Sequence, residues 1–282
     1  MRWGEPIINT SITYIDAKGP VYRNRAARDL AHSGVAFEAV VHLLLTGVWQ
    51  AAQDGWARIG TPADARGLLR HCRCVSGSAD VGKMLASAVL ALGMHGRGPE
   101  ELAGVGSLLS ARLILQTLAG LFGCLSPKGA FVERRPGETI AELLLRASGV
   151  PASADKLAVL NSVLIILADH ELAAATFAAR VAASTNSDLF NCVGAAICAH
   201  AGFAASVATD SVKERLFDAL STRNAASLLV LVQERGASMF GFNHPLYPAG
   251  DPRADYILEL ASTLGAGDAN VRRFLAFVKR AR

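Results

Sequence analysis

Charged residues are scarce in this chain. They make up 18% of its 282 residues, whereas hydrophobic residues make up 51%. An average soluble domain carries about 25% charged residues, so part of this surface is expected to be buried against another subunit. A homo-oligomer is the simplest such assembly. The formal net charge is only +4 and the lysines and arginines are scattered, which does not favour a nucleic-acid-binding protein.

Cysteine is also sparse. The five cysteines form an odd-numbered set, which argues against a disulfide framework and predicts reduced thiols in a cytoplasmic protein. Cys72 and Cys74 form a single C-x-C unit without a second pair at a matching spacing. No metal site is therefore predicted.

Two kinds of hydrophobic segment are missing from the pattern. No apolar region follows Met1–Pro6, so a signal peptide is not expected there. The longest apolar run is taken as Leu157–Ala168, which Asn161 and Ser162 interrupt. This run is shorter than the ~20 residues that a membrane-spanning helix needs. We therefore expect a cytoplasmic protein that makes no contact with a membrane.

Alanine and leucine at helical spacing dominate the rest of the chain. The start differs, because Ile7–Ile15 alternates weakly and is followed by turn residues 16–19 and by Val21–Arg23. The pattern predicts an all-α fold with a minor N-terminal β-hairpin. A shift to a more charged composition near Gly202 predicts two helical domains, a large one over residues 1–202 and a small one over residues 203–282. Helices are expected over residues 25–31, 37–46, 62–75, 79–94, 100–121, 139–147, 154–168, 171–183, 189–200, 212–220, 225–234, 253–264 and 270–279.

A lone histidine stands between a glycine turn and a proline in the segment Gly241–Pro248. The proline that follows His244 biases it toward extended backbone, so its imidazole is expected on a stiff loop. Asp251 and Pro252 have the pattern of an N-cap and a first helical residue, which puts Arg253 in the first helical turn. The helix dipole disfavours a cation there and attracts anions, so an anion is expected to share the site. This arrangement suits a small carboxylate substrate. The alternative is a loop histidine and a surface arginine.

Asp169, His170 and Glu171 form a second polar cluster in an apolar neighbourhood. Three adjacent residues cannot share one helix face, so a helix break is expected here, with His170 turned toward a cavity. The zinc pattern H-E-x-x-H fails because residue 174 is alanine. The alternative interpretation is a hydrogen-bonded core histidine.

Taken together, these motifs resemble the citrate synthase family. The matching segments are Leu167–Thr185, Gly241–Ala254 and, near the N-terminus, Ile12–Asp16, Tyr22–Arg25 and Phe37–Gly47. They cover most of the chain in the family's order. The wording of Gly241–Ala254 is similar to the bacterial branch that often carries an N-terminal helix-turn-helix, a module that this sequence does not contain.

The resemblance implies an almost entirely helical dimer in which a cleft separates a large and a small domain. It implies condensation of an acyl-CoA with a 2-oxo acid such as oxaloacetate, followed by thioester hydrolysis. By the same resemblance His244 polarises the carbonyl of the oxo acid, while His170, Arg253 and Asn243 bind this substrate. A coenzyme A thioester is then the expected co-substrate, and no tightly bound cofactor is expected.

Two positions depart from the family's catalytic pattern. Residues 202–208 match the loop that carries a second catalytic histidine, and Ala205 stands where that histidine belongs. Residues 270–274 match the segment that carries a catalytic aspartate, and Arg272 stands at that position. An arginine stays protonated and cannot act as a general base.

Deprotonating a thioester α-carbon requires a positioned base and a stabilised enolate. Efficient citrate synthesis is therefore not expected unless Asp210, Glu214 or Asp268 replaces the base, and each of these is otherwise expected to be a solvated surface carboxylate. Three functions remain open. The chain is a citrate synthase-like enzyme with altered or impaired machinery, or an inactive dicarboxylate-binding subunit that pairs with a fuller paralogue in a hetero-oligomer, or a CoA-independent lyase or hydrolase.

Overall fold

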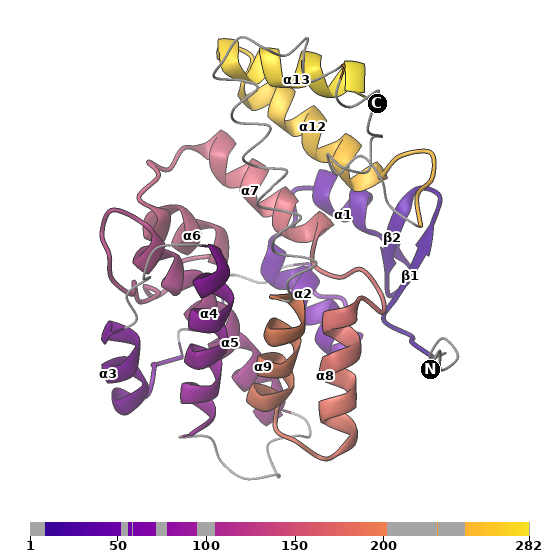
Figure 1. Cartoon of the computed structure of the whole chain (residues 1–282). Helices are drawn as coiled ribbons and strands as arrows, with labels where there is room; N and C mark the ends of the chain where they lie inside the picture. The colour runs from indigo at the N-terminus through magenta and orange to yellow at the C-terminus, as the bar shows by residue number, and fades with distance from the viewer. Residues whose placement is uncertain are drawn as a thin grey trace.

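The computed structural model describes residues 9–51, 56–57, 59–71, 78–94, 105–201, 230 and 246–281. This part of the chain is mostly helical, with one small antiparallel sheet near the N-terminus (Figure 1), which confirms the predicted fold class. The strands are β1 (Thr13–Asp16), β2 (Gly19–Tyr22) and β3 (Arg25–Ala26). The helices are α1 (Ala27–His32), α2 (Phe37–Thr46), α3 (Ala63–His71), α4 (Ser78–Gly93), α5 (Val105–Leu125), α6 (Ile140–Ser148), α7 (Ala154–Ile166), α8 (Ala174–Ser184), α9 (Leu189–His200), α12 (Pro252–Leu264) and α13 (Ala269–Ala281).

The predicted hairpin is present and forms part of a sheet with the strand order β1-β2-β3. Its turn is closed by Asp16, whose Oδ1 accepts a hydrogen bond from the Lys18 N–H at 2.7 Å. Gly19 follows with a φ of +116°, a conformation that glycine adopts at little cost. The turn residues that the sequence indicated are therefore those that reverse the chain.

A second tight turn, at Arg23 and Asn24, creates a third strand that was not predicted. Both residues have left-handed backbone, with φ values of 46° and 66°, the combination that two-residue hairpin turns favour. Asparagine tolerates this conformation, but arginine rarely adopts it. The expected helix over residues 25–31 was therefore wrong at its start, because residues 25 and 26 pair with β2 before α1 begins.

Buried apolar side chains gather in three groups within the described residues. The largest group lies between the sheet, α1, α2, α6, α7 and α12, and it includes the fully buried Tyr22 and Leu143. Tyr256 brings α12 into this group. The second group contains Phe190 and joins α4, α5 and α9, whereas the third contains Leu69 and joins α3, α4 and α5. The sheet and the junction after α7 are thus held over the largest group.

Helix α5 contributes to all three groups. Its stretch Gly106–Leu125 is long and apolar enough to cross a membrane by length and composition, a property that core helices of soluble proteins share. This stretch is longer than Leu157–Ala168, so the expectation about the longest apolar run was wrong.

The loop that follows α5 lies directly on this helix, because the Ala130 N–H donates to Gly123 O at 3.2 Å. A Cβ at Gly123 would lie 2.2 Å from Ala130 O, which explains the glycine.

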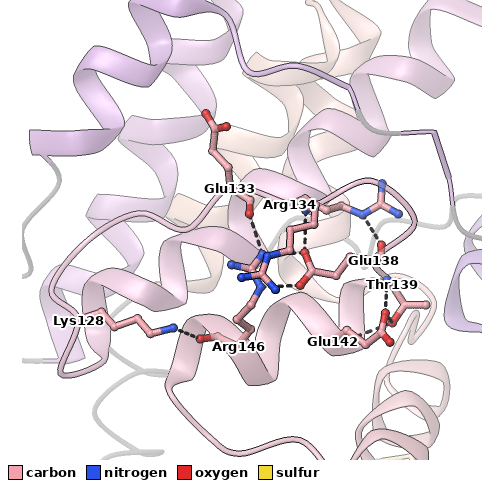
Figure 2. Close-up of polar contacts among 8 residues, drawn as sticks. Lys128, Glu133, Arg134, Glu138, Thr139, Glu142 and Arg146 are labelled. Atoms are coloured by element: carbon pink, nitrogen blue, oxygen red, sulfur yellow. Dashed lines mark hydrogen bonds and ion pairs between the residues drawn. The ribbon is translucent and has the colours of Figure 1, made fainter.

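A network of partly buried charges holds the start of α6 (Figure 2). Arg146 pairs with Glu138 through Nε–Oε1 at 2.6 Å and Nη2–Oε2 at 2.7 Å, and Arg134 Nε donates to the Glu138 carbonyl at 2.6 Å. Thr139 and Glu142 form a capping box in which each side chain accepts the other's backbone N–H. Burial raises the pKa of Glu138, but the hydrogen bonds from Arg146 and the backbone outweigh it and hold that pKa below its ordinary value.

Most of the other predicted helices are present, with ends that differ by a few residues. The largest difference is at the end of α5, which continues to Leu125 rather than ending at residue 121, while residues 100–104 lie outside the described chain. The predicted helices over residues 212–220 and 225–234 lie almost entirely outside the described residues. The predicted domain boundary between residues 202 and 203 falls at the edge of the described chain and stays a prediction.

Candidate functional site

The connection between α7 and α8 carries the cluster Asp169, His170 and Glu171. Helix α7 ends at Ile166 and α8 begins at Ala174, which confirms the expected helix break. Glu171 has left-handed backbone with a φ of 56°, and its N–H donates to Asp169 Oδ2 at 3.2 Å. Asp169 and Glu171 line the same cavity, whereas His170 between them contacts Tyr247.

Tyr22 on β2 fixes this connection from inside the core. Its side chain is fully buried, and its hydroxyl oxygen lies 3.1 Å from Ile165 O, 3.2 Å from Ile166 O and 3.2 Å from Asp169 O. The same oxygen accepts the Asp169 N–H at 3.3 Å. Burial raises the pKa of Tyr22 to about 12, so the hydroxyl is a permanent donor at neutral pH. The end of α7 and the backbone next to His170 are thereby tied to the sheet.

His170 contacts Tyr247, which lies in the loop before α12. His170 Nε2 is 3.2 Å from Tyr247 Oη, and the two rings are tilted with their centroids 5.7 Å apart. Tyr247 is only 5% exposed, and the Arg253 guanidinium lies 5.7 Å from the centroid of its ring. Burial raises the pKa of Tyr247, although the charge of Arg253 opposes this effect. The structure thus brings His170 and Arg253 to the same protonated tyrosine.

The start of α12 has the caps that the sequence predicted. Asp251 is the N-cap and accepts the Arg253 N–H at 2.9 Å, and Pro252 is the first helical residue. The carboxylate of Asp251 also pairs with the Arg253 side chain, through Nη2–Oδ2 at 2.6 Å and Nε–Oδ1 at 3.0 Å. The anion that lies beside Arg253 in the structure is thus a carboxylate of the chain itself, and the predicted binding of a substrate carboxylate stays a prediction. Because a guanidinium has five N–H donors, Nη1 can still serve a second acceptor.

Three of the predicted site residues, His244, Asn243 and Ala205, lie outside the described residues, as do the alternative bases Asp210 and Glu214. Their predicted roles stay predictions.

Arg272 lies on the exposed surface of α13, where its Nη1 donates to Ala266 O at 2.7 Å. The structure does not bring it to the group around Tyr247. Asp268 accepts the Asn270 N–H at 2.7 Å and so caps α13, a structural role that fits its interpretation as a surface carboxylate.

A cavity of about 400 Å³ lies against the same α7–α8 connection. His170 is not among the residues that line it, whereas its neighbours Asp169 and Glu171 are. The contact of His170 with Tyr247 fits one part of the alternative interpretation, the hydrogen bond, but His170 is half-buried rather than a core residue. Within the described ranges, no three His, Cys, Asp or Glu side chains are grouped to hold a metal ion. Cys72 and Cys74 are outside those ranges.

Sequence reasoning missed Tyr22 and Tyr247, the two tyrosines that organise the site. A weak signal exists for Tyr247, since it stands between Pro245 and Pro248 in a segment with little conformational freedom. No local signal marks Tyr22, because its partners lie 143 or more residues away.

Comparisons with known proteins agree with the motifs. The family model described as citrate synthase, C-terminal domain, matches residues 1–281. Citrate synthase 2 of Bacillus subtilis is 36% identical over 134 residues, which cover 47% of this chain and 36% of that protein. The 2-methylcitrate synthase of Shewanella oneidensis is 36% identical over 135 residues, with the same shares of each chain. These matches span about a third of the relatives' own length.

Solved structures show the same fold. A citrate synthase from Thermoplasma acidophilum, in a ternary complex with carboxymethyl coenzyme A and oxaloacetate, superposes with a TM-score of 0.77 at 22% identity. This match covers 98% of the present chain and 75% of the other. The citrate synthase of Pyrobaculum aerophilum gives a TM-score of 0.75 at 23% identity, covering 98% and 73% of the two chains.

Proposed function

The chain belongs to the citrate synthase family, and we propose that it binds a 2-oxo acid such as oxaloacetate beside His170, Tyr247 and Arg253. The observation that carries this proposal is the contact between the two longest segments of resemblance. His170 belongs to Leu167–Thr185 and Tyr247 to Gly241–Ala254, and the two side chains lie 3.2 Å apart. A substrate pocket requires these segments to meet, whereas two unrelated surface motifs would have no reason to do so.

In this proposal Arg253 binds a carboxylate of the oxo acid. Asp251 holds the guanidinium through Nε and Nη2, which fixes the direction in which Nη1 can donate. Both side chains are mostly buried, with exposed fractions of 13% for Arg253 and 20% for Asp251, and hydrogen bonds to charged groups gain strength under such conditions. His244 and Asn243 complete the pocket, with His244 polarising the carbonyl.

The reaction proposed is the making or breaking of a C–C bond between the oxo acid and an acyl-CoA, with impaired efficiency. Two substitutions support the impairment. The side chain of Ala205 cannot form the hydrogen bond of the histidine that it replaces, and Arg272 cannot accept a proton and points to Ala266. These substitutions also favour the second candidate, an inactive subunit that binds a dicarboxylate and pairs with a fuller paralogue. A cytoplasmic homodimer is proposed for the enzyme.

Calorimetric titration tests this function directly. The purified chain is titrated with oxaloacetate, 2-oxoglutarate and citrate, each with and without acetyl-CoA. The variants Arg253→Gln and His170→Ala are compared with His200→Ala, an exposed histidine at the end of α9. Losing a hydrogen bond from a charged group costs about 1.5–3 kcal/mol, so Arg253→Gln should weaken binding roughly 10- to 150-fold, and His200→Ala should not change it.

The pattern of binding separates the candidates. Oxo-acid binding that strengthens with acetyl-CoA supports the enzyme and is followed by a turnover assay. Binding that is indifferent to acetyl-CoA supports the dicarboxylate-binding subunit or a CoA-independent lyase. If no oxo acid binds, or if Arg253→Gln and His170→Ala bind as the wild type does, the proposed pocket is wrong.

A further inference from the structure

The described residues assigned above to the oxo-acid pocket, His170, Tyr247 and Arg253, are not among those that line the cavity beside the α7–α8 connection. Its volume of about 400 Å³ is within the range of small-molecule sites, ~300–1,000 Å³. Asp169 and Glu171 line the cavity, while His170 between them contacts Tyr247. One short backbone segment therefore presents side chains to two different places. The cavity is lined by residues 9–12 and by Asp169, Glu171, Leu172, Thr176 and Arg180.

The charged groups of this lining do not neutralise one another. Arg180 donates from Nη2 to the backbone oxygen of Asn9 at 3.2 Å. Asp169 accepts the Glu171 N–H through Oδ2. Among the residues that the structure describes, neither Arg180 nor the two carboxylates form an ion pair. Two carboxylates and one guanidinium thus line a concave surface, and none of them is in an ion pair with a described residue. Such a surface concentrates ligands of complementary charge.

The cation and the carboxylates of the lining come from different elements of the fold. Thr176 and Arg180 are four residues apart and share one face of α8. Asp169 and Glu171 precede the first residue of α8. The guanidinium of Arg180 lies at the N-terminal segment, because its Nη2 donates to Asn9 O at 3.2 Å. A ligand in the cavity would place its anionic group near Arg180 and its cationic groups near the connection.

We propose that this cavity binds a small basic amino acid, a molecule with one carboxylate and two cationic groups. That composition is the complement of one guanidinium and two carboxylates. The carboxylate would pair with Arg180, for which a guanidinium offers parallel N–H donors. The two cationic groups would be held by Asp169 and Glu171, with the Thr176 hydroxyl as a further hydrogen-bond partner.

Titration calorimetry of the whole chain, in the absence of any oxo acid, tests the proposal. The probes are L-lysine, L-arginine, glycine and glutarate. L-Lysine and L-arginine are expected to bind at least about tenfold more tightly than glycine, and glutarate is expected not to bind. Glu171→Gln and Arg180→Gln should each weaken L-lysine binding by about tenfold or more, while Arg273→Gln, an exposed cation on α13, should not. Circular dichroism verifies that each variant is folded.

Several results would overturn this site. Equal binding of glycine and L-lysine would contradict the charge argument, and so would L-lysine binding that survives both cavity substitutions. In that case Asp169 and Glu171 act only as anions that stabilise the N-terminus of α8. The outcome is independent of the oxo-acid pocket, because His170→Ala should retain L-lysine binding even where it abolishes oxaloacetate binding.

Discussion

Replacing Tyr22 by phenylalanine should destabilise the protein by about 2–3 kcal/mol at neutral pH. Phenylalanine keeps the ring in the core, but it removes a hydroxyl that accepts the Asp169 N–H at 3.3 Å and lies 3.1 Å from Ile165 O and 3.2 Å from Ile166 O. Leaving a buried polar group without its partner costs ~1–3 kcal/mol. The Asp169 amide loses its acceptor and the carbonyls at the end of α7 lose a donor, which gives the total.

The same substitution should remove part of the sensitivity to alkaline pH. Burial raises the pKa of Tyr22 from 10.0 to about 12. The folded state therefore keeps a proton that the unfolded state releases, so this stabilisation is complete below pH 10 and is lost as the pH rises through 12. One pKa unit corresponds to about 1.36 kcal/mol. Between pH 9 and pH 11 the wild type should lose about 1.3 kcal/mol that the phenylalanine variant does not lose.

Urea unfolding followed by far-ultraviolet circular dichroism at pH 7, 9 and 11 measures both effects. Tyr14→Phe is the matched control, because Tyr14 lies on the neighbouring strand and is 52% exposed. Its free energy of unfolding should follow that of the wild type at every pH. A Tyr22→Phe variant within about 0.5 kcal/mol of the wild type at pH 7, or one whose difference from the wild type stays constant to pH 11, would refute the reasoning.

Three further predictions concern the free energy of unfolding and are checked by urea denaturation. Thr139→Ala removes the capping box of α6 and should cost about 1 kcal/mol. Gly123→Ala would place a Cβ 2.2 Å from a backbone oxygen and should cost about 1–3 kcal/mol. Its control is Gly67→Ala on α3, where a Cβ meets nothing within 4 Å and the change should be neutral or stabilising. Equal losses of stability in the two variants would contradict the packing argument. Arg28→Ala should change stability by less than about 1 kcal/mol, because its ion pair with α12 is 51% exposed on the Arg28 side.

Local chemistry made part of the site predictable. Aspartate is a common N-cap residue and proline a common first helical residue, so Asp251 and Pro252 are enough to predict where α12 begins. The break between α7 and α8 follows from the impossibility of burying Asp169, His170 and Glu171 on one helix face. Both are decided by neighbours in the chain, and the structure agrees with both.

Long-range contacts account for what could not be predicted. The partner of His170 is Tyr247, and the partners of Tyr22 lie at the end of α7. The spacing of apolar residues along the chain indicates helices and strands, but it does not indicate which distant residues will be in contact. The third strand was missed for a different reason, because Arg23 adopts a left-handed conformation that its residue type disfavours and that only the pairing of β2 with β3 imposes.

The pairing of Arg253 with Asp251 bears on how the proposed oxo-acid pocket would select its ligand. The pair is electrically neutral, so it offers little net charge to attract a dicarboxylate from a distance. The pair instead fixes the orientation of the guanidinium, because Nε and Nη2 are both bonded to Asp251 and the remaining N–H donors then point in a set direction. Tyr247 adds to this order by contacting both Arg253 and His170. Selection at this pocket would then depend on the geometry of hydrogen bonds rather than on charge, and that geometry depends on the anchoring of the α7–α8 connection by Tyr22.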